Sequence, residues 1–227
     1  MRIRRLYIPI QSHTVQILTT QYPNGLPNQL SKMSGLVHYS GSGTNPDDLA
    51  SVNAQQAKYI VILAKQEDNR DSDSRTFDIL YRLKALKLRE DALILAECVD
   101  DDNRQRFRLA GAHIIIRPMR AYPEMLIRGL VAPGSEQIIE NLFSSLGDLY
   151  LRYDVTIKHL SWKDIVCQLI QQDLGIAVAY IDSKTGQCET NPHAHTQINA
   201  SSLFVMANDD NRPTQQSIQQ ALAEISK

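Results

Sequence analysis

The sequence predicts an α/β fold in three parts: a lobe built on a parallel β-sheet, a helical crossover and a small α+β lobe. Between Val37 and Pro118, short apolar strands alternate with amphipathic segments of helical length. This alternation is typical of right-handed crossovers and a parallel sheet. Two helical segments around Pro133-Gly134 follow, and then short strands around one helix. We therefore expect boundaries that divide the chain into residues 1–118, 119–150 and 151–227.

The strands of the first lobe are rich in the β-branched and aliphatic residues that suit strands buried on both faces. They are VHYS (37–40), YIVILA (59–64), ALILAEC (92–98) and HIIIRP (113–118). Pro46 opens a short helix, a longer helix covers Ser74 to Leu88, and a third helix runs from Asn103 to Ala110, where Gly111 ends it. Ahead of them we expect a first strand over residues 4–10, a helix from His13 to Thr20 and, over residues 22–35, a loop with at most one short helix.

The chain changes character after Arg120. We expect helices over Met125 to Leu130 and over Ser135 to Leu149, separated by the Pro133-Gly134 break. The second helix carries a broad apolar stripe, which is either core or a partner surface. Its residues are Ile138, Ile139, Leu142, Phe143, Leu146 and Leu149.

The small lobe begins with the strand-like segment VTIKHL (155–160). A helix from Ser161 to Gln172 follows, and then the strands GIAVAYID (175–182) and SSLFVMAN (201–208). Short strands with one helix make a small α+β domain. The tail from Thr214 to Lys227 is polar and helix-prone, and we expect a loosely held terminal helix.

Composition excludes several classes of protein. The formal net charge is -1, with acids and bases interspersed, so no electrostatic footprint for nucleic acid is present. No apolar run approaches the roughly 20 residues that a bilayer span needs, and the first residues lack the apolar core of a signal peptide. We expect a soluble, cytoplasmic chain. The three cysteines, Cys98, Cys167 and Cys188, have no C-x-x-C spacing, and we expect buried thiols that act as small hydrophobes.

Glycines at a nucleotide site would follow the first strand as G-x-G-x-x-G, because they let a helix N-terminus approach the pyrophosphate. That fingerprint is absent after residues 4–10. The nearest similar segment is Gly41-Ser42-Gly43, which lacks the third glycine. A tight turn between strand and helix is the favoured interpretation of Gly41 and Ser42, and weak nucleotide binding is the alternative.

Acidic residues cluster where two neighbouring strands end, which is where ligands sit in parallel sheets. Asp71 and Asp73 follow one strand, and Glu97 and Asp100 lie at the end of the next. Converging carboxylates suit a hard cation such as Ca²⁺. The alternative is that Asp71, Ser72 and the acids from Asp100 to Asp102 cap helices. Histidines, cysteines and serines show no catalytic spacing, and nothing argues for an enzyme.

Five segments together resemble the RCK domain, the regulator of potassium conductance also called the TrkA-like domain. They are GSGTNPDDL (41–49), AKYIVILA (57–64), DSDSRTFDILYRLKAL (71–86), LILAECVDDDN (93–103) and RLAGAHIIIRP (108–118). The match covers about 80 residues and continues more weakly through residues 119–149 into the C-terminal lobe.

The resemblance implies a Rossmann-like lobe and a ligand-sensing gating-ring module that controls a potassium channel. It implies that the partners are a second copy of the chain, in dimers that build a ring of eight lobes, and the membrane pore domain on the cytoplasmic side. The stripe from Ile138 to Leu146 then becomes a dimer interface. The resemblance also implies an effector that the sequence does not name, and Ca²⁺ and an adenine nucleotide are the candidates.

Two departures qualify the resemblance. The missing glycines place nucleotide binding at the usual site in doubt. Calcium-gated members carry acids at the positions of Asp73, Glu97 and Val99, and a valine side chain cannot ligate a cation. Two alternatives stay open: a regulatory subunit of a Trk/Ktr-type potassium transporter, and an enzyme domain with a decayed NAD site.

Overall fold

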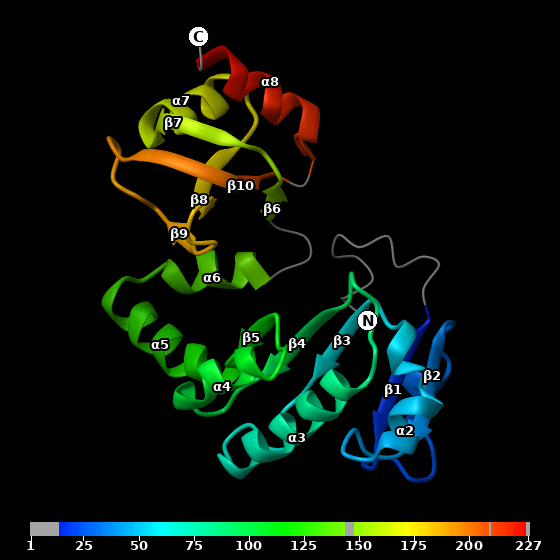
Figure 1. The fold of residues 1–227 in the computed structure, drawn as a ribbon. Coiled ribbons are helices and arrows are strands. Elements are labelled where there is room, and N and C mark those ends of the chain that lie inside the picture. The colour runs from blue at the N-terminus through cyan, green and yellow to red at the C-terminus, as the bar shows by residue number, and fades with distance from the viewer. Residues whose placement is uncertain (1–13, 144–147, 209, 226–227) are drawn as a thin grey trace. The chain divides into compact units, whose positions relative to one another are not determined.

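The computed structural model describes residues 14–143, 148–208 and 210–225, with side chains for all of these except 118–124 and 143. The chain divides into two compact units, and the boundary between them follows Val131. Figure 1 labels elements of both units. This division falls inside the helical segment predicted over residues 119–150, whose limits stay a prediction. Among the described residues, no helix has the length and apolar composition that crossing a membrane requires.

Parallel strands build the first unit. β1 (Val15–Thr19) pairs with β2 (Leu36–Ser40), and β3 (Tyr59–Ile62) pairs with β4 (Leu93–Glu97), which in turn pairs with β5 (Ile114–Ile116). All three pairings are parallel and run in unbroken register. This confirms the α/β class with parallel strands.

Helices connect these strands. They are α1 (Asn28–Ser31), α2 (Pro46–Ser51), α3 (Asp71–Ala85), α4 (Arg104–Leu109) and α5 (Pro118–Val131), with 3₁₀ turns over Ala54–Gln56 and Asp101–Asn103. The buried apolar residues of α2, α3 and α4 belong to one cluster with Ile62, Ile94 and Ala96 of the sheet. Leu80 and Leu83 of α3 are fully buried at its centre, at the i, i+3 spacing of one helix face. These three helices therefore cover the same face of the strands.

Several boundaries in the first unit differ from the expected ones. The helix expected from His13 to Thr20 is wrong, because residues 15–19 form β1. Three of its five residues are apolar and two are threonine or glutamine, a pattern too short to separate helix from strand. The helix α3 starts at Asp71 and ends at Ala85, three residues earlier at each end than expected. The strand expected over residues 4–10 lies outside the described residues.

An antiparallel sheet forms the second unit. Its long central strand β10 (Gln197–Ala207) pairs with β6 (Leu149–Tyr153), β7 (Ile157–Ser161) and β8 (Ile176–Asp182), and β8 also pairs with β9 (Cys188–Thr190). The helices are α6 (Ser135–Phe143), α7 (Trp162–Gln171) and α8 (Gln215–Ile225). Ile165, Leu169 and Leu203 are fully buried where α7 and α8 pack on the sheet.

Two expectations for the second unit are wrong. The helix expected from Ser135 to Leu149 is described over Ser135–Phe143, and Leu149 instead begins β6. The terminal helix is not loosely held, because Ile218, Ala221 and Leu222 of α8 are buried in the core. Those three residues lie on one helix face at i, i+3 and i+4, which gives a mostly polar helix a narrow apolar side.

Candidate functional site

Three loops leave the carboxyl ends of β2, β3 and β4, and the first turn of α3 is bonded to all of them. Ser72 is bonded to the loop after β3, Asp73 to the loop after β4, and Arg75 to the loop after β2. Ligands of open parallel sheets bind at this edge. One helical turn therefore joins the segments that a ligand at this edge would touch.

Asp73 makes the most extensive of these connections. Its side chain is buried, with the residue 2% exposed, and it accepts hydrogen bonds from the backbone N–H groups of Val99 (2.8 Å) and Asp100 (2.9 Å). The side-chain amide of Asn103 donates a third bond of 2.8 Å. A buried carboxylate must be paired, and these donors pair it. Asp73 thus fixes the start of the loop that leads from β4 to α4.

Ser72, Arg75 and Glu97 complete the connections. The Ser72 hydroxyl accepts from the N–H of Gln66 at 2.9 Å and donates to the carbonyl of Gln66 at 2.8 Å. Nη2 of Arg75 donates to the Ser42 hydroxyl at 2.8 Å. Oε2 of Glu97 accepts from the N–H of Ala64 at 2.8 Å, which joins the ends of β3 and β4.

The turn at Gly41 and Ser42 is filled by a side chain of the protein itself. Oδ2 of Asp48, from α2, accepts the N–H of Ser42 at 2.8 Å. A Cβ atom at Gly41 would lie 2.7 Å from the Asp48 carboxyl, so a larger residue here would displace this carboxyl. A carboxylate therefore takes the backbone donor that a phosphate would use. The geometry suits the tight turn, and nucleotide binding at Gly41 and Ser42 stays a prediction.

The four predicted acids have different surroundings. Asp71 is exposed at the start of α3. Asp100 caps the 3₁₀ turn by accepting the N–H of Asp102 at 3.3 Å, and it pairs with Arg70 at 3.3 Å. Within the described part of the chain, no three His, Cys, Asp or Glu side chains gather into a set that could hold a metal ion. Asp100 caps only the 3₁₀ turn. The capping of α3 by Asp71 and Ser72 is wrong, because α3 begins at Asp71 and its capping position, Arg70, makes no side-chain cap bond. The calcium site built on Asp73 and Glu97 stays a prediction.

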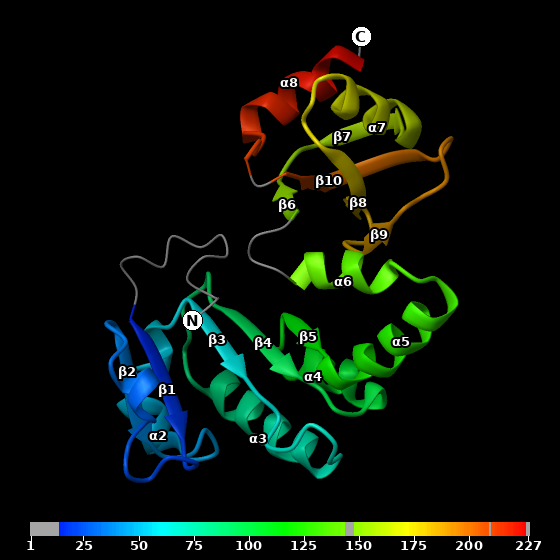
Figure 2. The same cartoon turned by 180° about the vertical axis from the view of Figure 1, so that it is seen from behind.

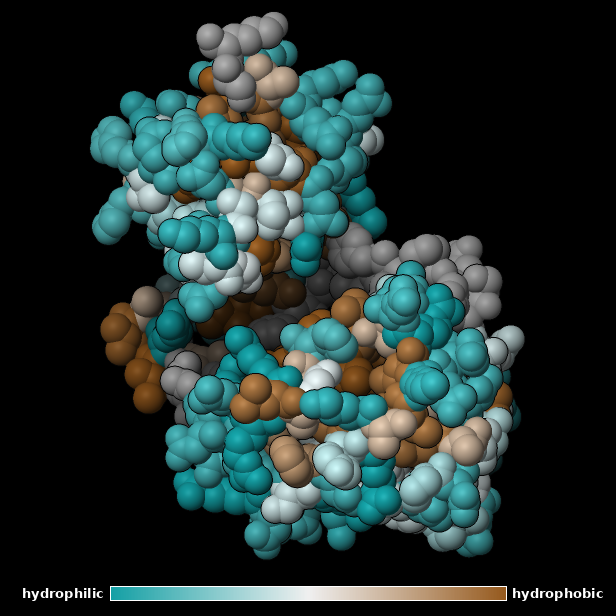
Figure 3. All heavy atoms as spheres, in the orientation of Figure 1, coloured by the Kyte–Doolittle hydropathy of each residue, from teal (hydrophilic) through white to brown (hydrophobic). Residues whose placement is uncertain are grey.

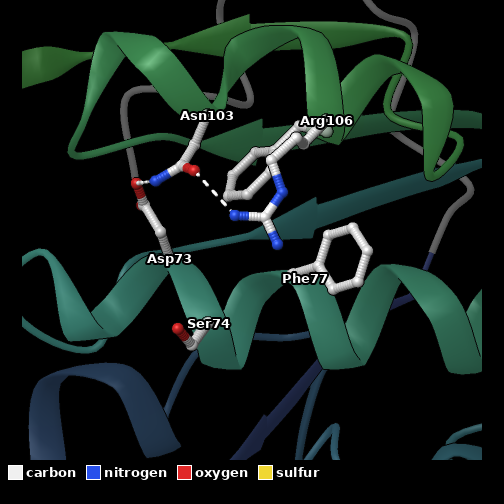
Figure 4. A pocket seen from close by; sticks show the side chains of 6 residues that line it. Asp73, Ser74, Phe77, Asn103 and Arg106 are labelled. Carbon is white, nitrogen blue, oxygen red and sulfur yellow. Dashed lines mark hydrogen bonds between the residues drawn. The ribbon is translucent and has the colours of Figure 1, made fainter.

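A small cavity of about 110 Å³ opens beside this network, between α3 and α4. It is lined by Asp73, Ser74, Phe77, Asn103, Arg106 and Phe107. Figure 4 shows Asn103 between Asp73 and Arg106, to which it is joined by hydrogen bonds of 2.8 and 3.1 Å. The Arg106 guanidinium lies over the Phe77 ring at 5.1 Å. The cavity therefore presents a positive charge that is held in place by an amide and a ring.

Sequence reasoning did not find Asp48 and Arg75. The signal for Asp48 was its place three residues after the helix cap Asn45, from which it can reach back to the glycine turn. Arg75 gave no signal, because its partner Ser42 lies 33 residues earlier in the chain.

Cysteine burial differs from the expectation. Cys98 is buried as expected, but Cys167 and Cys188 are exposed, so the expectation is wrong for both. Burial and the nearby Asp73 carboxylate raise the pKa of the Cys98 thiol to about 11. Its Sγ donates a 2.9 Å hydrogen bond to the carbonyl of Asp100. The thiol stays protonated and belongs to the same network.

We expect iodoacetamide at pH 8 to alkylate Cys167 and Cys188 quickly and Cys98 only after unfolding. The thiolate is the reactive form, and a pKa of about 11 leaves little of it at that pH. Because the folded pKa of Cys98 exceeds its unfolded value of 9.0, its contribution to stability is complete below about pH 9 and is lost toward pH 11. Mass spectrometry of tryptic peptides checks the labelling. Rapid labelling of Cys98 in folded protein would contradict the geometry.

Comparison with known proteins shows what the chain is similar to. Residues 1–95 match the family model of the calcium-activated potassium channel slowpoke-like RCK domain. Over these residues the chain is similar to RCK domains. The ion channel POLLUX of Lotus japonicus is 26% identical over 176 residues, which cover 75% of this chain and 19% of that protein. The ion channel DMI1 of Medicago truncatula is 25% identical over 176 residues, again 75% of this chain and 20% of that protein.

Solved structures support the fold. The human SLO3 gating ring aligns with 92% of the chain and 42% of that chain, at 15% identity and a TM-score of 0.65. This likeness shows a shared fold and nothing further. The chain spans about one fifth of the length of the curated relatives it matches.

Proposed function

We propose that this chain is a ligand-sensing regulatory domain on the cytoplasmic side of a potassium channel, where it biases the pore by a change of conformation. The observation that carries the proposal is the slowpoke-like RCK match over residues 1–95, which include β1, β2, β3 and α3. The curated relatives are named ion channels, which favours a channel over a transporter subunit. A regulatory domain, rather than a catalyst, fits these relatives.

The network around α3 provides a way to transmit binding. Three loops at the ligand edge are bonded to residues 72–75, so a ligand that displaces one loop changes the bonds of α3. A ligand can shift an equilibrium only by binding two conformations with different affinity. We infer that the two conformations differ in the position of α3 relative to these loops.

Ca²⁺ and an adenine nucleotide are the two candidate effectors. The matching family model is named for a calcium-activated potassium channel, and this name favours Ca²⁺. Asp71 is exposed, and Asp100 pairs with Arg70, the residue before Asp71, so we assign these two acids to direct contact. Asp73 and Glu97 already accept backbone N–H groups, and we assign them to holding the loops.

Titration calorimetry with Ca²⁺, Mg²⁺, AMP, ADP, ATP and NAD tests this function. We expect heat of binding from Ca²⁺ or from an adenine nucleotide. For Ca²⁺, the double variant Asp71→Asn/Asp100→Asn should abolish binding. Asp68→Asn, an exposed acid in the loop before α3, removes charge nearby and should leave binding unchanged. If no titration gives heat of binding, ligand sensing is refuted, and the chain would be an assembly scaffold that binds no ligand.

A second copy of the chain is the proposed partner, and assembled dimers would build the ring that acts on the pore domain. α5 ends with Leu130 and Val131, which are 83% and 80% exposed, and Figure 3 shows brown side chains gathered at this end of the helix. On α6, Ile138 is 66% exposed, Leu142 is exposed and Ile139 is half-buried. Exposed apolar side chains that gather on one helix, as on α6, mark candidate interaction sites. Of the remaining predicted interface residues, the Phe143 side chain and Leu146 lie outside the described part.

We expect the double variant Ile138→Glu/Leu142→Glu to convert a dimer into a monomer, because it places two charges in an apolar interface. Light scattering after size exclusion reports the mass. The control is Leu109→Glu on α4, which is 72% exposed and lies outside the proposed interface. A dimer that survives the double variant, or a control that dissociates equally, would contradict the assignment.

A further inference from the structure

The small cavity between α3 and α4 lies within the first unit, where both helices pack on the same strands. Figures 1 and 2 show these two helices side by side from opposite directions. The cavity volume of about 110 Å³ is several times the ~30 Å³ share of one water molecule, but it is well below the roughly 300–1,000 Å³ of pockets for drug-sized ligands. The cavity therefore has room for a small chemical group and not for a whole nucleotide.

The cavity lining offers hydrogen-bond donors, because its acceptors are already engaged. Oδ1 of Asp73 accepts the backbone N–H of Val99, and Oδ2 of Asp73 accepts the side-chain amide of Asn103. Oδ1 of Asn103 accepts from Arg106. Arg106 uses one N–H group in that bond, and a guanidinium carries five. The lining is therefore poor in acceptors for a cation and rich in donors for an anion.

Arg106 carries a positive charge that no described carboxylate neutralises. Among the described residues, no carboxylate lies within ion-pairing distance of Arg106, whereas Arg82 on α3 pairs with Asp78 at 3.1 Å. The Arg106 guanidinium is held over the Phe77 ring at 5.1 Å instead. Its planar fork matches the paired oxygens of a carboxylate or a phosphate. A guanidinium held in this way can bind an external anion.

We infer that this cavity is a binding site for a small oxyanion, a phosphate or a short carboxylate, held by the Arg106 guanidinium. Figure 4 shows that guanidinium between Asn103 and Phe77, with Ser74 on the neighbouring helix. The exposed hydroxyl of Ser74 lines the same cavity and supplies a further donor. This inference goes beyond the proposed function and does not depend on a Ca²⁺ or nucleotide site.

Asn103 links the oxyanion site to the loop after β4. Its amide donates to Asp73 and its carbonyl oxygen accepts from Arg106, so these three side chains form one chain of hydrogen bonds. Asp73 in turn holds the backbone N–H of Val99 in that loop. An anion that draws Arg106 towards itself weakens the bond that orients Asn103. Binding in the cavity is thereby transmitted to the loop.

Titration calorimetry of the full chain with sodium phosphate, in metal-free buffer and with sodium chloride of equal ionic strength as the blank, tests the site. We expect a dissociation constant on the order of 1 mM, because one guanidinium provides few charge-assisted hydrogen bonds. Sodium acetate in place of phosphate shows which oxyanion binds more tightly.

Variants of α4 separate the site from a general effect of charge. Arg106→Gln should weaken phosphate binding by about tenfold or more, and Arg106→Lys should weaken it less, because lysine keeps the charge and lacks the planar fork. Arg108→Gln removes an equal charge from an exposed position on the same helix and should leave binding unchanged. Failure of both anions to bind, or equal binding by wild type and Arg106→Gln, would overturn the inference.

Two further measurements test the source of the anion and the link to the loop. If light scattering shows that Arg106→Gln converts a dimer into a monomer, the guanidinium pairs with a carboxylate of a second copy, and the inference is overturned. Phosphate should change hydrogen exchange over residues 98–103 in the wild type and not in Arg106→Gln, and unchanged exchange with phosphate bound would overturn the link through Asn103. Because no Ca²⁺ or nucleotide is present, this site can fail while ligand sensing holds, and the reverse.

Discussion

Replacing Asp73 by alanine is expected to lower the free energy of unfolding of the first unit by about 3–5 kcal/mol, because it leaves several buried polar donors without their charged acceptor. The donors are the N–H groups of Val99 and Asp100 and the amide of Asn103. Asp73→Asn keeps one carbonyl acceptor and should lose less. The expected order of stability is wild type, then Asp73→Asn, then Asp73→Ala.

The measurement can separate the two units, because the chain has one tryptophan. Trp162 is buried in the second unit, so its fluorescence reports unfolding there. Far-ultraviolet circular dichroism reports both units. Asp73→Ala should shift the dichroism transition to lower denaturant and leave the fluorescence transition in place. Asp71→Ala, an exposed acid in the same helical turn, is the matched control. An equal loss in both variants would show that Asp73 does not hold the loops.

Gly175→Ala is expected to destabilise the second unit by more than about 3 kcal/mol, since it combines a left-handed backbone with a backbone clash. Gly175 has φ +93°, and a Cβ atom there would collide with the carbonyl oxygen of Met206 in β10. The backbone of a central strand cannot move aside cheaply. The Trp162 fluorescence transition should shift strongly to lower denaturant.

Gly186 provides the matched control for this substitution. It also has a positive φ, of +69°, but a Cβ atom there would meet nothing within 4 Å. Gly186→Ala should therefore cost only the backbone strain, about 1–2 kcal/mol. If both substitutions lower the free energy of unfolding equally, the close approach of Gly175 to β10 does not affect stability.

Apolar runs predicted most of the architecture, because strands buried between layers must be apolar wherever they occur. The strands around Ile62, Ile94 and Ile115 were predicted on this ground, and so was the helix of Leu80 and Leu83. The strand β1 was not predicted, because its five residues show no apolar periodicity that distinguishes a helix from a strand. The burial of Ile218 in α8 depends on the rest of the core against which the helix packs, and the local sequence does not predict that contact.

The position of the acids could be predicted from the sequence, but their roles could not. Acids after neighbouring parallel strands lie at one edge of the sheet, and Asp73 and Glu97 contact the loops there. Whether a carboxylate accepts backbone N–H groups or faces a cation depends on the path of each loop. Pairs such as Arg75 with Ser42 lie 33 residues apart, and only the folded chain brings them together.

The most direct test of ligand sensing is hydrogen exchange of the full chain with and without the effector that calorimetry identifies. The account predicts changed protection in the three loops after β2, β3 and β4 and in the first turn of α3, because Ser72, Asp73 and Arg75 join them. An effector that binds without changing exchange in these segments, or a panel without any effector, would contradict it.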